Sequence, residues 1–174
     1  MSSGLPEFLD LAHVTRQPLE RAGRVRIGAM PRLCAALADT KGEAMLHLQA
    51  RNDGAGQIVL QGRVQAELTL SCQRCLKPVL RPVSADFYLA WVRDEEQAVA
   101  VQTGNCDPLL SADGRIRLAE LVEDELLLAL PIVALHDIGE CEARPGEPVT
   151  RIETPEIPAQ QNPFAVLKQL KEQR

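Results

Sequence analysis

The sequence predicts an α+β fold built on an antiparallel β-sheet. Residues 63–70 and 79–91 each alternate apolar and polar side chains, which is typical of half-buried strands. Between them lies the short segment 71–78, which carries two cysteines in a Cys-x-x-Cys spacing. Helical periodicity at 118–130 adds one helix packed on the sheet. We therefore expect an antiparallel sheet that can curl toward a barrel, with a Cys-x-x-Cys hairpin knuckle, this packed helix and a C-terminal helix.

Length and composition indicate a globular chain with one main domain. The chain has 174 residues, and 45% of them are hydrophobic, which is enough for a core of its own. Residues 142–161 contain four prolines and little apolar pattern. We expect a single α+β domain at 1–141, a proline-rich loop or linker at 142–161, and a C-terminal helix at 162–174.

The charge of the chain limits what it can bind. Its formal net charge is −5, so its overall field does not favour nucleic acid, and we expect no binding to DNA. Aromatic residues make up only 3% and leave few rings for stacking on bases, so RNA binding would need a local basic patch. No apolar run approaches the ~18 residues of a membrane span, and the N-terminus lacks the pattern of a secretory signal. We expect a cytoplasmic protein that does not bind membranes.

The first third of the chain combines strands, a short helix and a basic stretch. Residues 5–11 indicate an edge strand, residues 31–38 a helix with a proline near its first turn, and residues 43–50 a strand. A basic stretch precedes the helix and contains Arg21, Arg24 and Arg26. It is either a solvated face or a strip that contacts phosphate groups, because the arginine fork matches phosphate oxygens.

Strands dominate the middle of the chain. Residues 57–61 indicate a strand, and Gly62 suggests a bulge before the strand continues. Pro82 predicts that the second long strand lies at a sheet edge at that point, because proline has no N–H to donate. The acidic segment 94–106 has little pattern and indicates a long loop.

The predicted helix at 118–130 has an apolar stripe and an acidic face. The acidic side chains are Glu120, Glu123, Asp124 and Glu125. Consecutive acidic residues spread around a helix instead of sharing one face, which favours a solvated surface over a catalytic or metal-binding group. The C-terminal helix should begin at Asn162, a good N-cap, followed by Pro163 at its first position.

Four residues of metal-binding type are candidates for one site: Cys72, Cys75, His136 and Cys141. Three cysteines and one histidine form a recognised ligand set for structural zinc. The first pair has the expected spacing, whereas His136 and Cys141 are further apart than usual. Two alternatives stay open. The thiols can be purely structural, or Cys72 and Cys75 can form a redox dithiol, although a strand follows them and not the helix N-terminus that lowers a thiol pKa.

Basic side chains flank the two cysteines of the knuckle. They are Arg74, Lys77 and Arg81. Together with Arg21, Arg24 and Arg26, they are the only candidate surfaces for RNA. The acidic net charge implies that such binding would be local and sensitive to salt, or mediated by a partner protein.

Four blocks in order resemble the YceD family. The blocks are Cys72-Gln73-Arg74-Cys75 with Lys77-Pro78, then Val122 to Pro131, then His136-Asp137 with Cys141, and finally Asn162 to Leu167. This family comprises bacterial proteins, with plastid relatives, that are associated with accumulation of large-subunit ribosomal RNA. Some relatives look richer in cysteine in the segment that matches 136–141, which implies a metal site in the ancestry of that segment.

The resemblance implies a factor in biogenesis of the large ribosomal subunit that is not an enzyme. Its implied partner is large-subunit ribosomal RNA or a pre-ribosomal particle, contacted directly or through a ribosomal protein. Two other hypotheses come from the residues themselves. One is a dithiol oxidoreductase that uses Cys72 and Cys75. The other is a zinc-stabilised adaptor that binds proteins through the apolar stripe of the C-terminal helix, formed by Phe164, Leu167 and Leu170.

Overall fold

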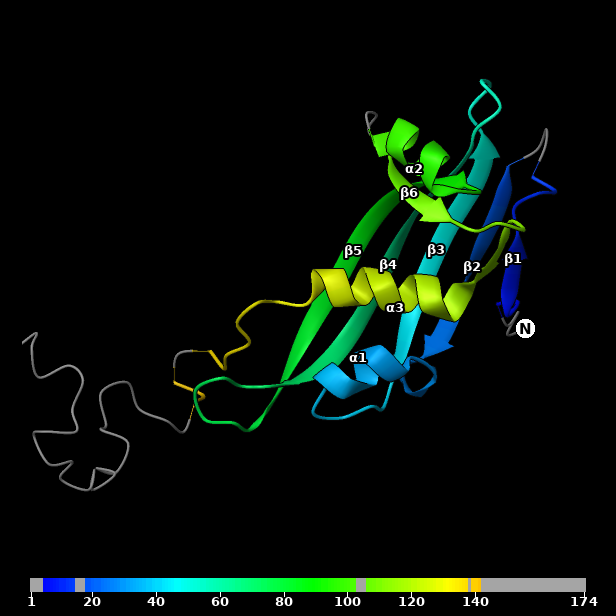
Figure 1. The fold of residues 1–174 in the computed structure, drawn as a ribbon. Helices are drawn as coiled ribbons and strands as arrows, with labels where there is room; N and C mark the ends of the chain where they lie inside the picture. The colour runs from blue at the N-terminus through cyan, green and yellow to red at the C-terminus, as the bar shows by residue number, and fades with distance from the viewer. Residues whose placement is uncertain (1–4, 15–17, 103–105, 138, 142–174) are drawn as a thin grey trace, which may run out of the picture. The chain divides into compact units, whose positions relative to one another are not determined.

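A five-stranded sheet forms the centre of the computed structural model, which describes residues 5–14, 18–102, 106–137 and 139–141 (Figure 1). The strand order is β2-β3-β4-β5-β6. Strands β2 to β5 pair antiparallel in sequence order, so the sheet is mainly antiparallel, as expected. Strand β6 runs parallel to β5. The strands span Leu19–Arg26 (β2), Glu43–Asn52 (β3), Ile58–Ser71 (β4), Pro78–Val92 (β5) and Asp107–Leu110 (β6).

The sheet is open, so the expectation that it could curl toward a barrel is wrong. Among the described residues, β2 pairs only with β3, and β6 pairs only with β5. Strand β6 has four residues and covers β5 only from Leu89 to Val92, so the rest of that edge of β5 has no described strand beside it. At Pro82, β5 therefore has β4 on one side and no described strand on the other, as the proline predicted.

One face of the sheet is covered by helix α3 (Leu118–Ala129), which lies across the strands in Figure 1. This helix confirms the predicted one. The core between the helix and the sheet is built mainly from leucine, and its fully buried side chains include Leu46, Leu48, Leu60, Leu68 and Leu126. None of the described helices is long and apolar enough to cross a membrane.

Shorter elements complete the covered face. Helix α1 (Pro31–Ala36) contacts α3 and follows the 3-10 turn η1 (Ile27–Ala29). Strand β1 (Phe8–Asp10) pairs antiparallel with β7 (Arg115–Arg117) in a separate two-stranded sheet. The described residues, which end at Cys141, belong to one compact unit. The predicted linker at 142–161 and the predicted helix at 162–174 lie outside the described residues.

Helix α2 (Glu95–Gln102) occupies the segment that was expected to be a loop. Its start is stabilised by Asp94, whose side chain accepts the backbone N–H of Gln97 at 2.8 Å. In return, the side chain of Gln97 accepts the N–H of Arg93 at 3.0 Å. An Asp followed three residues later by Gln is close to the capping-box pattern, which the weak apolar periodicity of this helix concealed.

Gly62 marks a close approach of side chains and not a bulge. Strand β4 runs through it without interruption, opposite Leu48 on one side and Phe87 on the other. A Cβ atom at this position would collide with the ring of Phe87 and with the carbonyl oxygen of His47. The missing side chain therefore makes room for the aromatic ring.

Candidate metal centre

Residues 72–77, the cysteine turn, connect β4 to β5. Within the turn, the N–H of Leu76 donates to the carbonyl of Cys72 at 2.8 Å, and the N–H of Cys72 donates to the carbonyl of Lys77 at 2.9 Å. Leu76 has a φ of 60°, the one positive φ among the described non-glycine residues. This left-handed residue closes the turn, so that Cys72 and Cys75 lie on the same side of it.

The chain that follows α3 returns to the cysteine turn and lies against it. The backbone N–H of Gln73 donates to the carbonyl of Ala134 at 2.9 Å, and its side chain donates to the carbonyl of Ile132 at 3.0 Å. Ala134 packs in a small apolar cluster with Cys72 and Val79. Backbone hydrogen bonds and packing thus hold residues 131–137 beside the turn independently of any ion.

The four predicted ligands come together in this place. The ligand atoms of Cys72, Cys75, His136 and Cys141 all lie within 4.8 Å of one another. Four ligand atoms around one zinc ion would lie roughly 3.8 Å apart, given Zn–S distances of about 2.3 Å and tetrahedral angles. The arrangement can hold a metal ion, and three sulfur atoms with one imidazole nitrogen match the preference of zinc.

Hydrogen bonding fixes which nitrogen of His136 faces the cluster. The Nε2 atom lies 3.0 Å from the carbonyl oxygen of Pro78, which can only accept a hydrogen bond. Nε2 is therefore the protonated nitrogen in the neutral ring, and Nδ1 keeps a free lone pair. That Nδ1 atom lies 3.3 Å from the sulfur of Cys75, so the ring is oriented as a ligand by its second nitrogen.

The environment of the two turn cysteines shifts their pKa values in opposite directions. Burial of the Cys72 thiol raises its pKa, but backbone N–H groups of Cys75, His136 and Arg74 point at the sulfur and lower the pKa to about 5, from the ordinary 9.0. At Cys75, the N–H of Lys77 lowers the pKa. Burial and the neighbouring thiols of Cys72 and Cys141 outweigh it, so the pKa of Cys75 is raised. The lowered pKa favours the thiolate form of Cys72, which is the form that binds metal ions.

The predicted RNA-binding residues in the cysteine turn and at the start of β5 differ in how far their side chains are already paired. Arg74 is exposed and forms no ion pair with the residues that the structure describes. Arg81 is half-buried: its guanidinium donates to the carbonyl of Leu135 and forms an ion pair with Asp137 at 3.0 Å. Lys77 is exposed. Arg74 and Arg81 line a groove of about 570 Å³ between the edge of β5 and the segment after α3, which we call the arginine groove.

The N-terminal arginines lie on β2, a strand that sequence reasoning did not predict, and they do not form one strip. Alternation along β2 places Arg21 on the face that α3 covers and Arg24 and Arg26 on the opposite face. Arg24 pairs with Glu43 at 3.4 Å, whereas Arg26 has no described ion pair. Strands β3 and β4 separate these arginines from the edge strand that carries Arg81.

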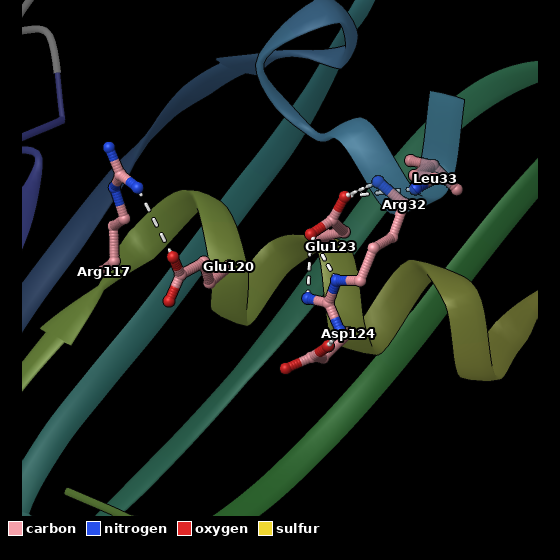
Figure 2. A network of polar contacts seen from close by, with 6 residues as sticks. All are labelled: Arg32, Leu33, Arg117, Glu120, Glu123 and Asp124. Atoms are coloured by element: carbon pink, nitrogen blue, oxygen red, sulfur yellow. Dashed lines mark hydrogen bonds and ion pairs between the residues drawn. The ribbon is translucent and has the colours of Figure 1, made fainter. Parts of the chain in front are cut away.

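The prediction that all acidic residues of α3 are solvated is wrong for Glu123. This residue is buried, not solvated, and its carboxylate accepts the backbone N–H groups of Arg32 at 2.6 Å and Leu33 at 3.1 Å (Figure 2). The Arg32 guanidinium bridges Glu123 at 2.8 Å and Asp124 at 2.6 Å. Met30, at the N-cap position of α1, makes no side-chain cap. Glu123 of α3 takes this role and accepts the N–H groups of the first turn of α1.

Comparison with known proteins agrees with the sequence resemblance. A family model described as "Large ribosomal RNA subunit accumulation protein YceD" matches residues 60–171, a range that contains all four residues of the metal-ligand cluster. A relative from Haemophilus influenzae with the same description is 30% identical over 168 residues, which cover 97% of each chain. No solved structure matches the chain. The chain belongs to the YceD family.

Proposed function

We propose that the protein is a cytoplasmic factor, not an enzyme, that supports accumulation or processing of large-subunit ribosomal RNA. The observation that carries this proposal is the relationship to a relative described as a large ribosomal RNA subunit accumulation protein, which extends over 97% of both chains. Similarity over nearly the whole length supports a shared role of the whole chain and not of one motif.

Zinc is the cofactor that fits this proposal. Cys72, Cys75, His136 and Cys141 would hold the ion, which would supply a structural cross-link and no reaction. The ligands come from two segments far apart in sequence, so the cross-link ties the turn between β4 and β5 to the segment after α3. The cross-link would keep the arginine groove in one shape, since both of these segments line it.

Direct contact with RNA is proposed at the arginine groove. Arg74 projects from the cysteine turn without a described ion-pair partner, and Lys77 lies in the same turn. Free guanidinium groups bind phosphate oxygens well, so Arg74 would make the main contact. The charge of Arg81 is largely balanced by Asp137, which lines the same groove, so Arg81 would act mainly on the shape of the groove wall. Because the chain has a formal net charge of −5, RNA contact would be confined to the arginine groove, and its affinity would fall as the salt concentration rises.

A redox function receives less support from the same geometry. A dithiol oxidoreductase attacks its substrate with an accessible thiolate of low pKa. Here the sulfur with the lowered pKa belongs to Cys72, which is completely buried, whereas the more accessible Cys75 has a raised pKa. The residues of the third hypothesis, the adaptor stripe at 162–174, lie outside the described part of the chain.

Ultraviolet crosslinking in cells, followed by sequencing of the attached RNA, tests the proposal. Reads concentrated in one region of large-subunit ribosomal RNA would establish direct binding and locate it. Reads at background level would remove direct binding and favour a ribosomal protein as the contact. Large-subunit ribosomal RNA levels that stay unchanged after deletion of the gene would contradict the role itself.

A further inference from the structure

A second groove lies on the sheet face that α3 does not cover. It has a volume of about 750 Å³ and is bounded by the segment before β3, by β4 and by the edge strand β5. We call it the acidic groove and define it by Asp39, Glu43, Met45, Glu67, Leu80 and Pro82. Strand register supports its shape, because Glu67 lies opposite Pro82, and Thr69 lies opposite Leu80 and also bridges to Asp39.

The groove exposes apolar side chains on a face that is otherwise polar. Met45 is 52% exposed and Leu80 is 56% exposed, and both line the groove. Their neighbours along the same face of the strands include His47, Gln49 and Arg63. Exposed apolar side chains gathered in a groove mark a binding surface more often than single exposed ones do, and methionine adapts its shape to different partners.

The charge of the groove excludes one class of ligand and favours another. Asp39, Glu43 and Glu67 line it, and Lys41 is the one cation of the lining. Lys41 lies 3.8 Å from Asp39 with its side chain 90% exposed. Glu43 also pairs with Arg24 at 3.4 Å from the neighbouring strand β2, so Glu67 is the carboxylate of the groove without a described cation partner. A phosphate backbone would be repelled here, whereas lysine and arginine side chains would be attracted.

The acidic groove and the arginine groove lie on opposite sides of the same strand edge. Pro82, Val83 and Ser84 of β5 line both. Pro82 has no N–H to offer at this edge, so a partner would be recognised by side chains and not by addition of a full strand. The edge of β5 therefore separates the acidic groove, which is partly apolar, from the basic arginine groove.

We propose that the acidic groove binds a basic polypeptide segment that carries at least one apolar side chain. The apolar side chain packs on Met45 and Leu80, and a flanking lysine or arginine pairs with Glu67. A second basic side chain can share Glu43 with Arg24. Basic segments of this kind are typical of proteins that bind nucleic acid. The inference rests on the proposed function in one respect, which is that the partner is expected among proteins that bind the same RNA.

Fluorescence anisotropy with the full-length protein tests the inference. The probes are labelled synthetic peptides copied from the basic terminal segments of large-subunit ribosomal proteins, together with versions in which the apolar residue is replaced by serine. The variants are Glu67→Lys and Leu80→Ser. Glu96→Lys, on the exposed surface of α2, is the matched control for the charge change. Circular dichroism checks that each variant is folded.

We expect at least one peptide to bind, with affinity that falls about tenfold in Glu67→Lys, because a like charge then faces the peptide. The loss should be similar in Leu80→Ser and for the serine peptides, whereas Glu96→Lys should bind as the wild type does. Absence of binding by every peptide, or equal binding to Glu67→Lys, would overturn the inference. The inference would also be overturned if a short RNA bound the protein and its affinity fell in Leu80→Ser, because the groove would then bind RNA.

The failure of this inference can be told apart from the failure of the proposed function. If the inference alone is wrong, crosslinks to ribosomal RNA persist while no peptide responds to Glu67→Lys. If the proposed function alone is wrong, peptides bind at the groove while deletion of the gene leaves large-subunit ribosomal RNA unchanged.

Discussion

The Nδ1 atom of His136 lies 3.3 Å from the Sγ atom of Cys75, although the two residues are 61 positions apart in the sequence. The contact joins the cysteine turn to the segment after α3, and the hydrogen bond from Nε2 to Pro78 fixes the ring for it. A histidine oriented in this way beside three thiols has the donor set of a structural zinc site.

Zinc should copurify with the protein, and loss of one ligand should release it. We expect Cys141→Ser to bind less than one zinc per chain and to lower the free energy of unfolding by about 2–5 kcal/mol. This loss is below the roughly 10 kcal/mol typical of zinc-dependent peptides, because the sheet has a core of its own. Elemental analysis and urea unfolding measure the two quantities. Cys106→Ser, a thiol outside the cluster, is the control. Full zinc content in Cys141→Ser would remove that residue from the site.

The metal-free protein should become more stable as the pH rises from 5 toward 9. The pKa of Cys72 is about 5 in the folded chain against 9.0 for an ordinary thiol, so the unfolded state binds the proton more tightly over this interval. The stabilisation is complete above pH 9 and is lost as the pH falls through 5. Cys75 has a raised pKa, so its own contribution is complete below pH 9 and is lost only above it.

Urea midpoints of chelator-treated protein across this pH range measure the effect. The same series on Cys72→Ser serves as the reference, because every other titrating group stays in place. The wild type should gain more stability with rising pH than the variant does. Parallel curves for the two proteins would show that Cys72 is not a thiolate at neutral pH.

Arg74 and Arg81 should respond differently to substitution. Arg74→Glu should weaken RNA binding and reduce the slope of affinity against salt by about one, with stability unchanged. Arg81→Ala should lower the free energy of unfolding by about 1–3 kcal/mol, because the carbonyl of Leu135 and the carboxylate of Asp137 lose their partner. Filter binding at several salt concentrations and urea unfolding measure both. Arg51→Glu, which changes an arginine of β3 without a described ion pair, is the control. An equal loss of RNA affinity in this variant would show that the effect comes from net charge and not from the position of Arg74.

Most of the sheet could be predicted from the sequence because its signals are local. The alternation at 43–50, 63–70 and 79–91 follows from one face of each strand being buried, and Pro82 marks the open edge through its missing N–H. The four metal-type residues were also recognisable, since the ligand types are few. Their proximity depends on the return of the chain after α3, and no local pattern encodes that return.

The remaining features depend on contacts between distant segments. Strand β6 pairs in parallel with β5 through four residues, which is too short for a periodic signal. Gly62 has the same local signature whether it forms a bulge or makes room for the ring of Phe87. Glu123 looks like its exposed neighbours in the sequence, and only the position of α1 beside α3 buries it.

Glu123 should therefore be the acidic residue of α3 to which stability is most sensitive. Glu123→Ala removes the acceptor of the N–H groups of Arg32, which is partly buried, and Leu33, which is buried. It also leaves Asp124 as the one described carboxylate that pairs with the Arg32 guanidinium. We expect a loss of about 2–4 kcal/mol in the free energy of unfolding, because two backbone N–H groups lose their acceptor, while the Arg32 side chain is 55% exposed and can be solvated by water. Glu123→Gln should lose less, because its amide oxygen can still accept both N–H groups. Asp124→Ala, at an exposed position, should cost below about 1 kcal/mol. Urea unfolding ranks the three variants, and an equal loss in Glu123→Ala and Asp124→Ala would show that the cap on α1 contributes little beyond the ion pair itself.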